Sequence, residues 1–432
     1  MHALIKLIRH TYNMAEPHES RTVMNNVAFL SGLQAITYIL PIIVLPYLFR
    51  VIGPAKFGLI SFAQAFVQYF MILTDYGFSV SATKEISLAH NDQAKVSQIF
   101  SSVMAIKISL AYVSLLILAV IVFFVPRFQQ DWMVYILSFG VVAGNALFPV
   151  WFFQGVEKMK YIANLNILGE VIYVFFIFLF VRDRQDYLMV PIINSLVFLT
   201  IGLFGQYIVF RKFKVWFKFP GYRSIKHQLK AGWNVFISIV AINAYTTTRI
   251  FAVGLLTTNT LTGFYSIAER IASVAQTFPL TSFSQAIFPR LSKIYHRNKR
   301  LAFKIMQQVQ LITIIISLIC LPLIFIFAPL IVRIVCGGHY PETVLSLRLL
   351  LMGVFFVAAN AFRVQFLLVC GKTDIYSRIH LAMAMIGLPL IVGLIYCFSY
   401  VGAALATVII EAGIFTITYL TVRKLRFTQS SP

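Results

Sequence analysis

Long apolar segments are the feature of this sequence that most restricts its fold. Runs of about 20 apolar residues recur along the chain, and each is long enough to cross the hydrocarbon core of a bilayer. Hydrophobic residues make up 59% of the 432 positions and charged residues only 12%. A membrane β-barrel would show short alternating segments instead. We therefore expect an all-α polytopic membrane protein.

Twelve apolar segments account for most of the chain, and prolines and glycines mark many of their ends. Residues 1–26 are polar and charged and contain no small-residue cleavage pattern, so we expect no cleavable signal peptide. The predicted spans are 27–48, 57–78, 100–125, 132–152, 162–181, 188–210, 231–255, 260–288, 306–332, 345–370, 376–398 and 402–422.

Lysine and arginine are distributed unevenly between the segments that join these spans. With both termini in the cytoplasm, 25 of the 36 lysines and arginines fall in cytoplasmic segments and 7 in outside loops. This bias predicts that orientation, and it places most of the net charge of +22 on the cytoplasmic face. Such a face suits anionic lipid headgroups, and no nucleic-acid-binding module is visible.

A repeat divides the chain into two similar halves. Residues Gly58–Gln64 reappear as Gly263–Glu269, 205 residues later, and Asn145 with Ala146 reappears as Asn360 with Ala361. The repeat predicts two pseudo-symmetric six-helix lobes with a polar seam between them, the usual plan of a transporter. The predicted divisions are a cytoplasmic tail at 1–26, an N-lobe at 27–210, a basic cytoplasmic linker at 211–230, a C-lobe at 231–422 and a tail at 423–432.

Polar side chains at helical spacing on the repeated spans are the candidates for binding a substrate at the seam. Arg270 lies on such a stripe, and pairing with a neighbouring helix is the alternative for it. For Arg249, Lys107 and Arg363 the alternative is a side chain that snorkels to the membrane surface. For the amides it is a hydrogen bond between helices. The candidates for the cavity are Arg270, Arg249, Arg363, Lys107, Gln64, Gln68, Asn234 and Tyr245.

Acidic side chains within the spans are candidates for ion coupling or for internal ion pairs. They are Asp75, Glu269 and Glu411, and Asp75 is expected to pair with Lys84 or Arg290. The sequence contains no GxSxG, HExxH or Walker A motif, and its cysteines and histidines form no ligand pattern. We expect no catalytic residue, no metal site and no cofactor, and hence no enzyme.

Three segments resemble a known family of transporters. Residues 151–161 (WFFQGVEKMKY) are similar to the segment after span 4 in Wzx-type O-antigen flippases. Residues 46–58 resemble the junction of spans 1 and 2 in that family, and residues 75–86 resemble the end of span 2. The resemblance extends over nearly the whole chain, and it implies a member of the MOP superfamily, with a MATE-like fold of two lobes around a basic cavity.

The resemblance also implies a function. Wzx-type flippases move undecaprenyl-pyrophosphate-linked O-antigen repeat units from the inner to the outer leaflet of the bacterial inner membrane. The expected partners are this lipid-linked oligosaccharide, membrane lipids and a complex with an O-antigen polymerase and a chain-length regulator. The alternatives are a MATE-like drug/cation antiporter or a lipid II flippase of the same fold, and a membrane enzyme such as an O-antigen polymerase.

Overall fold

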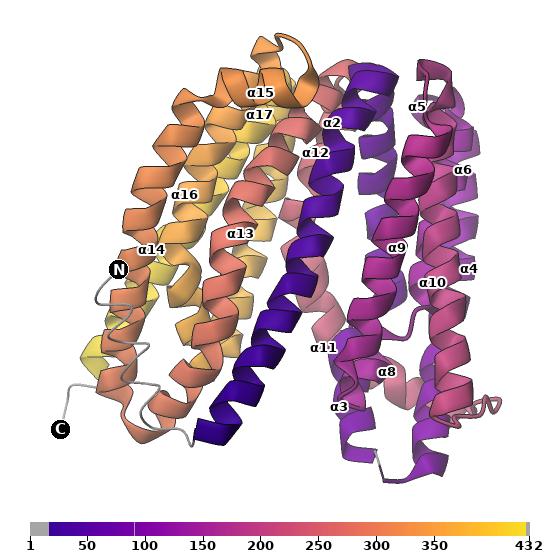
Figure 1. The fold of residues 1–432 in the computed structure, drawn as a ribbon, viewed down its shortest axis with the longest axis vertical. Helices are drawn as coiled ribbons and strands as arrows, with labels where there is room; N and C mark the ends of the chain where they lie inside the picture. The colour runs from indigo at the N-terminus through magenta and orange to yellow at the C-terminus, as the bar shows by residue number, and fades with distance from the viewer. Residues whose placement is uncertain (1–16, 90, 429–432) are drawn as a thin grey trace.

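A computed structural model describes residues 17–89 and 91–428, and this part of the chain is helical without strands (Figure 1). The helices follow the apolar segments, because a chain in lipid must satisfy its backbone hydrogen bonds internally. They are α2 (Pro17–Asp75), α3 (Phe78–Ala89), α4 (Gln93–Phe124), α5 (Pro126–Gln129), α6 (Trp132–Ser138), α7 (Gly140–Leu147), α8 (Val150–Gly155), α9 (Met159–Phe180), η1 (Arg184–Leu188, a 3-10 turn), α10 (Met189–Lys212), α11 (Tyr222–Thr246), α12 (Thr248–Leu256), α13 (Asn259–Arg297), α14 (Lys299–Ile326), α15 (Ala328–Cys336), α16 (Pro341–Val369) and α17 (Thr373–Thr428).

Two of these helical stretches each contain two membrane-crossing segments. The backbone leaves the helical conformation inside α2 at Gly53, where φ is 77°, and inside α17 at Ser399. A straight helix as long as α2 would extend about 90 Å, three times the thickness of the hydrocarbon core. Gly53 supplies this turn because a left-handed φ carries no steric penalty for glycine.

Two other crossing segments are broken. Helices α6, α7 and α8 form one segment, interrupted at Phe139 and at Phe148–Pro149, and α11 and α12 form another, bent by 48°. Among the described residues, eight helical stretches are long and apolar enough to cross a membrane, and the bent pair α11 and α12 adds a ninth. Two of the eight contain the kinks of α2 and α17 and so can each cross twice, which is consistent with the predicted number of about twelve spans. The predicted fold class is confirmed.

The two halves of the chain lie side by side. In Figure 1, helices α3 to α10 form one group and α13 to α17 form the other, with the first half of α2 between them. The groups spread apart towards the end at which α2 begins, which we call the inner end, following the predicted orientation. The opposite end, where α5, α12 and α15 lie, is the outer end.

The predicted linker between the lobes is helical at both of its ends. Helix α10 ends at Lys212 and α11 begins at Tyr222, so the non-helical part of the predicted linker 211–230 is 213–221. Residues 1–16 and 429–432 of the predicted tails lie outside the described residues. The exact lobe boundaries stay predictions.

The repeated segments pack directly on each other at the outer end. A Cβ atom on Gly58 would overlap the carbonyl oxygen of Asn259, and one on Gly263 would overlap that of Pro54. Pro54 and Asn259 are separated by the same 205 residues as the two glycines. The contact is therefore reciprocal, as across a two-fold axis, and the axis relating the repeats passes between α2 and α13.

Candidate functional site

Arg270 occupies the interface between the two repeated helices. Its Nη2 donates a hydrogen bond to Oε1 of Gln64 at 2.7 Å, so a C-lobe cation is held by an N-lobe amide. The side chain is exposed, and it is one of the residues that line a cavity of about 50 Å³. The other residues around this cavity are Pro41, Val44, Leu45, Leu48, Ile52, Phe57, Ile60, Ser61, Gln64, Tyr173 and Val190. The amide of Gln64 is neutral, so this hydrogen bond does not cancel the guanidinium charge, and the carboxylate of the neighbouring Glu269 lies within electrostatic reach.

Arg249 on α12 forms an ion pair with Glu269 on α13, the residue directly before Arg270. Nη2 of Arg249 lies 3.3 Å from Oε1 of Glu269, and the two side chains are only 16% and 14% exposed. Nη1 of Arg249 also donates to Oγ1 of Thr407 on α17 at 3.0 Å, and Glu411 lies within electrostatic reach of Arg249. These contacts neutralise Arg249 and join α12, α13 and α17, so Arg249 does not snorkel.

Tyr245 is buried behind this ion pair. Its hydroxyl group is hydrogen-bonded to Nδ1 of His380 at 2.8 Å, and the ring of Tyr376 lies 4.3 Å from the His380 ring. Tyr245 and His380 are only 4% and 9% exposed. His380 was missed from the sequence, although its position four residues after Tyr376 places both on one helical face.

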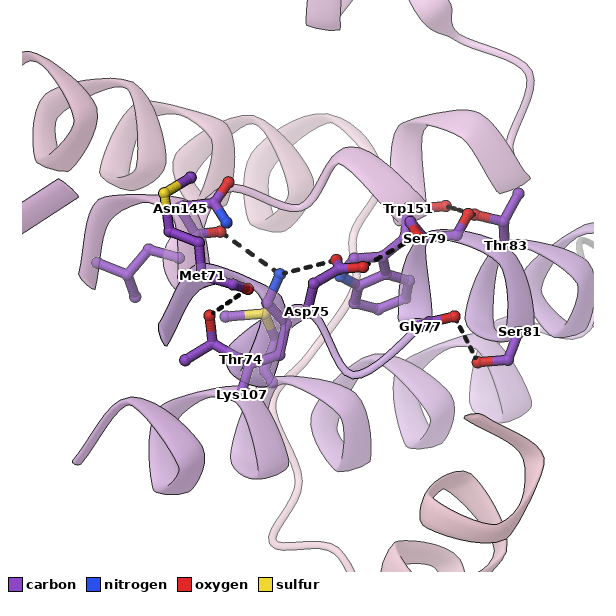
Figure 2. A network of polar contacts seen from close by, with 12 residues as sticks. Met71, Thr74, Asp75, Gly77, Ser79, Ser81, Thr83, Lys107, Asn145 and Trp151 are labelled. Atoms are coloured by element: carbon purple, nitrogen blue, oxygen red, sulfur yellow. Dashed lines mark hydrogen bonds and ion pairs between the residues drawn. The ribbon is translucent and has the colours of Figure 1, made fainter. Parts of the chain in front are cut away.

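Lys107 and Asp75 form a second polar cluster, inside the N-lobe (Figure 2). Nζ of Lys107 lies 4.0 Å from Oδ1 of Asp75 and 3.4 Å from the carbonyl oxygen of Asn145, and Ser79 donates to the other carboxylate oxygen at 3.0 Å. The Lys107 side chain is 3% exposed. The alternative that Lys107 snorkels is therefore wrong, because a carboxylate and a carbonyl group bind its ammonium group within the lobe.

The predicted partners of Asp75 also differ from the observed one. Asp75 contacts Lys107 instead of Lys84, and the side chain of Arg290 lies outside the described residues. Asp75 ends the helical part of span 2, since Tyr76 and Gly77 follow with φ of 48° and 77°. This break turns the carboxylate towards α4.

The C-lobe has an uncharged counterpart of Lys107. Nε2 of Gln310 on α14 donates to the carbonyl oxygen of Ala358 at 2.9 Å, and its Oε1 accepts the N–H of Phe362 at 3.1 Å. Lys107 and Gln310 each join the third helix of a lobe to the fourth. The N-lobe alone carries a charge at this place.

The remaining predicted residues have other surroundings. The Arg363 guanidinium is half-buried over the rings of Phe415 and Tyr419, at 5.1 and 5.3 Å. Gln68 is half-buried on α2, and Asn234 is exposed on α11. Among the described residues, no group of three His, Cys, Asp or Glu side chains is placed to bind a metal ion.

Two further arginines join the lobes at the outer end, and sequence reasoning assigned them no role. Arg127 donates to the carbonyl oxygen of Gly254 at 2.7 Å and to Oδ1 of Asn259 at 2.8 Å. Arg50 donates to the carbonyl oxygens of Ile334 and Val335. Each N-lobe arginine thus caps the C-terminal turn of a C-lobe helix, α12 or α15, where the unpaired carbonyls carry partial negative charge.

Comparison with known proteins places this architecture in a family. Residues 23–295 match the family described as "Polysaccharide biosynthesis protein". The protein belongs to this family. A relative named putative O-antigen transporter, from Escherichia coli K12, is 29% identical over 411 residues, which cover 93% of this chain and 97% of the relative. The glycan biosynthesis flippase Agl15 of Haloferax volcanii, named as probable, is 23% identical and covers 83% of this chain and 74% of its own.

Solved structures show that this family member has the fold of MOP-superfamily transporters. The lipid II flippase MurJ, in an inward closed conformation, superposes with a TM-score of 0.75 at 12% identity, covering 92% of this chain and 87% of MurJ. A MATE family multidrug transporter in an inward-facing conformation gives 0.70 at 13% identity, covering 91% and 100%. The predicted membership of the Wzx-type flippases of the MOP superfamily is confirmed, and these relatives are transporters and flippases, not enzymes.

Proposed function

We propose that this protein flips undecaprenyl-pyrophosphate-linked O-antigen repeat units across the bacterial inner membrane by alternating access. The polyprenyl tail stays in the lipid while the pyrophosphate and its sugars cross between the lobes. Both termini are cytoplasmic in this proposal, and the lobes at 27–210 and 231–422 move against each other.

The exposed guanidinium of Arg270 is the observation that carries the proposal. It lies at the interface of the lobes, where it donates a hydrogen bond to the neutral amide of Gln64 on the opposite lobe. A pyrophosphate needs cationic partners, and the planar guanidinium group binds phosphate oxygens in a fork. Because Arg249 is already paired with Glu269, Arg270 is the stronger candidate for the first contact with the pyrophosphate.

The contacts at the outer end support alternating access from the inner side. Arg50, Arg127 and the two glycines Gly58 and Gly263 hold the lobes together there. Substrate would enter from the inner leaflet, where the helices spread apart (Figure 1). A transporter of this kind exposes its site to one side at a time.

The names of the relatives support a lipid-linked glycan as the substrate class. One is named for the transport of O-antigen and another for flipping a glycan. A complex with an O-antigen polymerase and a chain-length regulator belongs to the same proposal, since both act on the flipped unit.

Complementation tests the proposal. The protein is produced in a bacterial strain that lacks its O-antigen flippase, with an empty vector as the control, and surface O-antigen is measured on gels together with tolerance to cationic drugs. We expect O-antigen to return and drug tolerance to stay unchanged. Failure to restore O-antigen across strains with different repeat units, combined with raised drug tolerance, would show an antiporter instead.

A further inference from the structure

The linker 213–221 between the lobes is fixed along one face of α4. Nε2 of Gln93 donates to the carbonyl oxygens of Phe213 and Lys214 at 2.7 and 3.0 Å. Ser97 accepts the N–H of Trp216 at 3.4 Å, and Ser101 accepts that of Lys218 at 2.9 Å. Gln93, Ser97 and Ser101 are spaced by four residues and so share one helical face. The linker is a strap with a defined register, not a loose tether.

The order of these contacts shows the depth of the strap. The strap runs along α4 for about two helical turns, from Gln93, the first residue of that helix, to Ser101. Helix α4 has 32 residues, whereas about 20 cross the hydrocarbon core, and its first turns carry the polar residues Gln93, Lys95, Ser97 and Gln98. These turns therefore lie at the level of the lipid headgroups, and the strap lies beside them.

The strap presents large aromatic side chains away from the protein. Val215 is 1% exposed and anchors it, whereas Trp216 is 69% exposed and Phe219 is 95% exposed. Tyr222, at the start of α11, is 76% exposed. Exposing these rings to water would cost free energy. At the headgroup level of a membrane, by contrast, aromatic residues are enriched.

Positive charges surround these rings. Lys214, Lys218 and Arg223 are all exposed, and residues 211–230 contain no acidic side chain. Basic residues close to an anionic leaflet are attracted to its phosphate groups. Aromatic and basic groups alternate along the strap, so one surface offers both a ring for the interface and a cation for a phosphate.

We propose that the strap 213–221, with Tyr222 and Arg223, binds anionic phospholipid headgroups. The ligand class is a phosphodiester lipid such as phosphatidylglycerol. A soluble acidic protein is disfavoured, because the rings lie at headgroup depth beside a membrane-crossing helix. Binding of these lipids holds the inner end of the N-lobe at the membrane surface, at the point where the chain passes to the C-lobe.

Chymotrypsin tests this proposal, because it cleaves after exposed aromatic residues. The full-length protein is placed in nanodiscs of phosphatidylcholine alone or with about a third phosphatidylglycerol, and the rate of cleavage within 213–223 is measured by mass spectrometry. The test variant is Lys214→Gln/Lys218→Gln/Arg223→Gln. The matched control, Arg297→Gln/Arg300→Gln/Lys304→Gln, removes three exposed charges from the turn between α13 and α14 at the same end.

We expect phosphatidylglycerol to slow cleavage of the strap at least threefold in the wild type and in the control variant. The test variant should show no such protection. In the wild type, 0.5 M NaCl should reduce the protection, since salt screens the attraction between exposed charges. Equal cleavage rates in both kinds of nanodisc would overturn the proposal. Equal protection in the test variant would overturn it too, because the basic residues would then have no part in binding.

Discussion

Gly58 and Gly263 pack against each other at the outer end of the interface, and each lies against a carbonyl group at the start of the other's helix. The pair occupies equivalent positions in the two repeats. A duplicated sequence has thus produced a reciprocal contact between its own copies. The lobes approach this closely only because neither position has a side chain.

Gly58→Ala is therefore expected to destabilise the protein. The added Cβ would overlap backbone atoms, which cannot rotate away as a side chain would, and such overpacking costs about 1–3 kcal/mol. The midpoint of thermal unfolding in detergent should fall by several degrees. Gly393→Ala is the control, because nothing lies within 4 Å of its added Cβ and alanine favours a helix. Equal midpoints for the two variants would contradict the packing described here.

The outer arginines are expected to hold the outer side closed. Replacing both guanidinium groups by shorter, neutral side chains with Arg50→Gln/Arg127→Gln should increase the fraction of molecules that open outwards. A cysteine introduced at Gln64 reports this state by its reaction with a membrane-impermeant thiol reagent added from outside, which we expect to accelerate severalfold. Arg333→Gln, an exposed arginine at the same end, should leave the rate unchanged. An unchanged rate in the double variant would show that these arginines do not control access.

The ion pair of Lys107 and Asp75 is expected to stabilise the N-lobe more than a surface pair does. Lys107→Met leaves the Asp75 carboxylate, 28% exposed, without its cation, and breaking a buried pair costs about 3 kcal/mol. Lys56→Met breaks the more exposed pair with Asp131, which is worth at most about 1 kcal/mol. The midpoint of thermal unfolding should therefore fall further for Lys107→Met than for Lys56→Met. An equal fall in the two variants would contradict the structural role assigned to Lys107.

Hydropathy and the repeat made the fold predictable from the sequence. The apolar length of a span indicates that it can cross the membrane. The repeated segment that contains Gly58 in one copy and Gly263 in the other identified the two helices, α2 and α13, that meet between the lobes. The helical ends of the predicted linker could not be seen in the sequence, because the polar residues from Tyr222 to Lys230 form the first turns of α11. Polarity at a helix end does not distinguish an exposed helical turn from a loop.

The partners of the charged residues could not be predicted in the same way. Helical spacing places Arg249 and Arg270 on a face, but it does not fix how that face is turned towards a neighbouring helix. The pairing of Arg249 with Glu269, and of Lys107 with Asp75, depends on how different helices pack against each other. Arg50 and Arg127 gave no signal, because most of their partners are backbone carbonyls, which every sequence offers.

The measurement that tests the central claim most directly is the O-antigen restored by Arg270→Ala and Arg270→Lys in the flippase-deficient strain. Both are compared with the wild type and with Arg333→Gln at equal amounts of protein in the membrane. If Arg270 binds the pyrophosphate, Arg270→Ala should reduce surface O-antigen at least tenfold, Arg270→Lys should retain part of it, and Arg333→Gln should match the wild type. Wild-type levels of O-antigen with Arg270→Ala would contradict the assignment of the substrate site to the seam between the lobes.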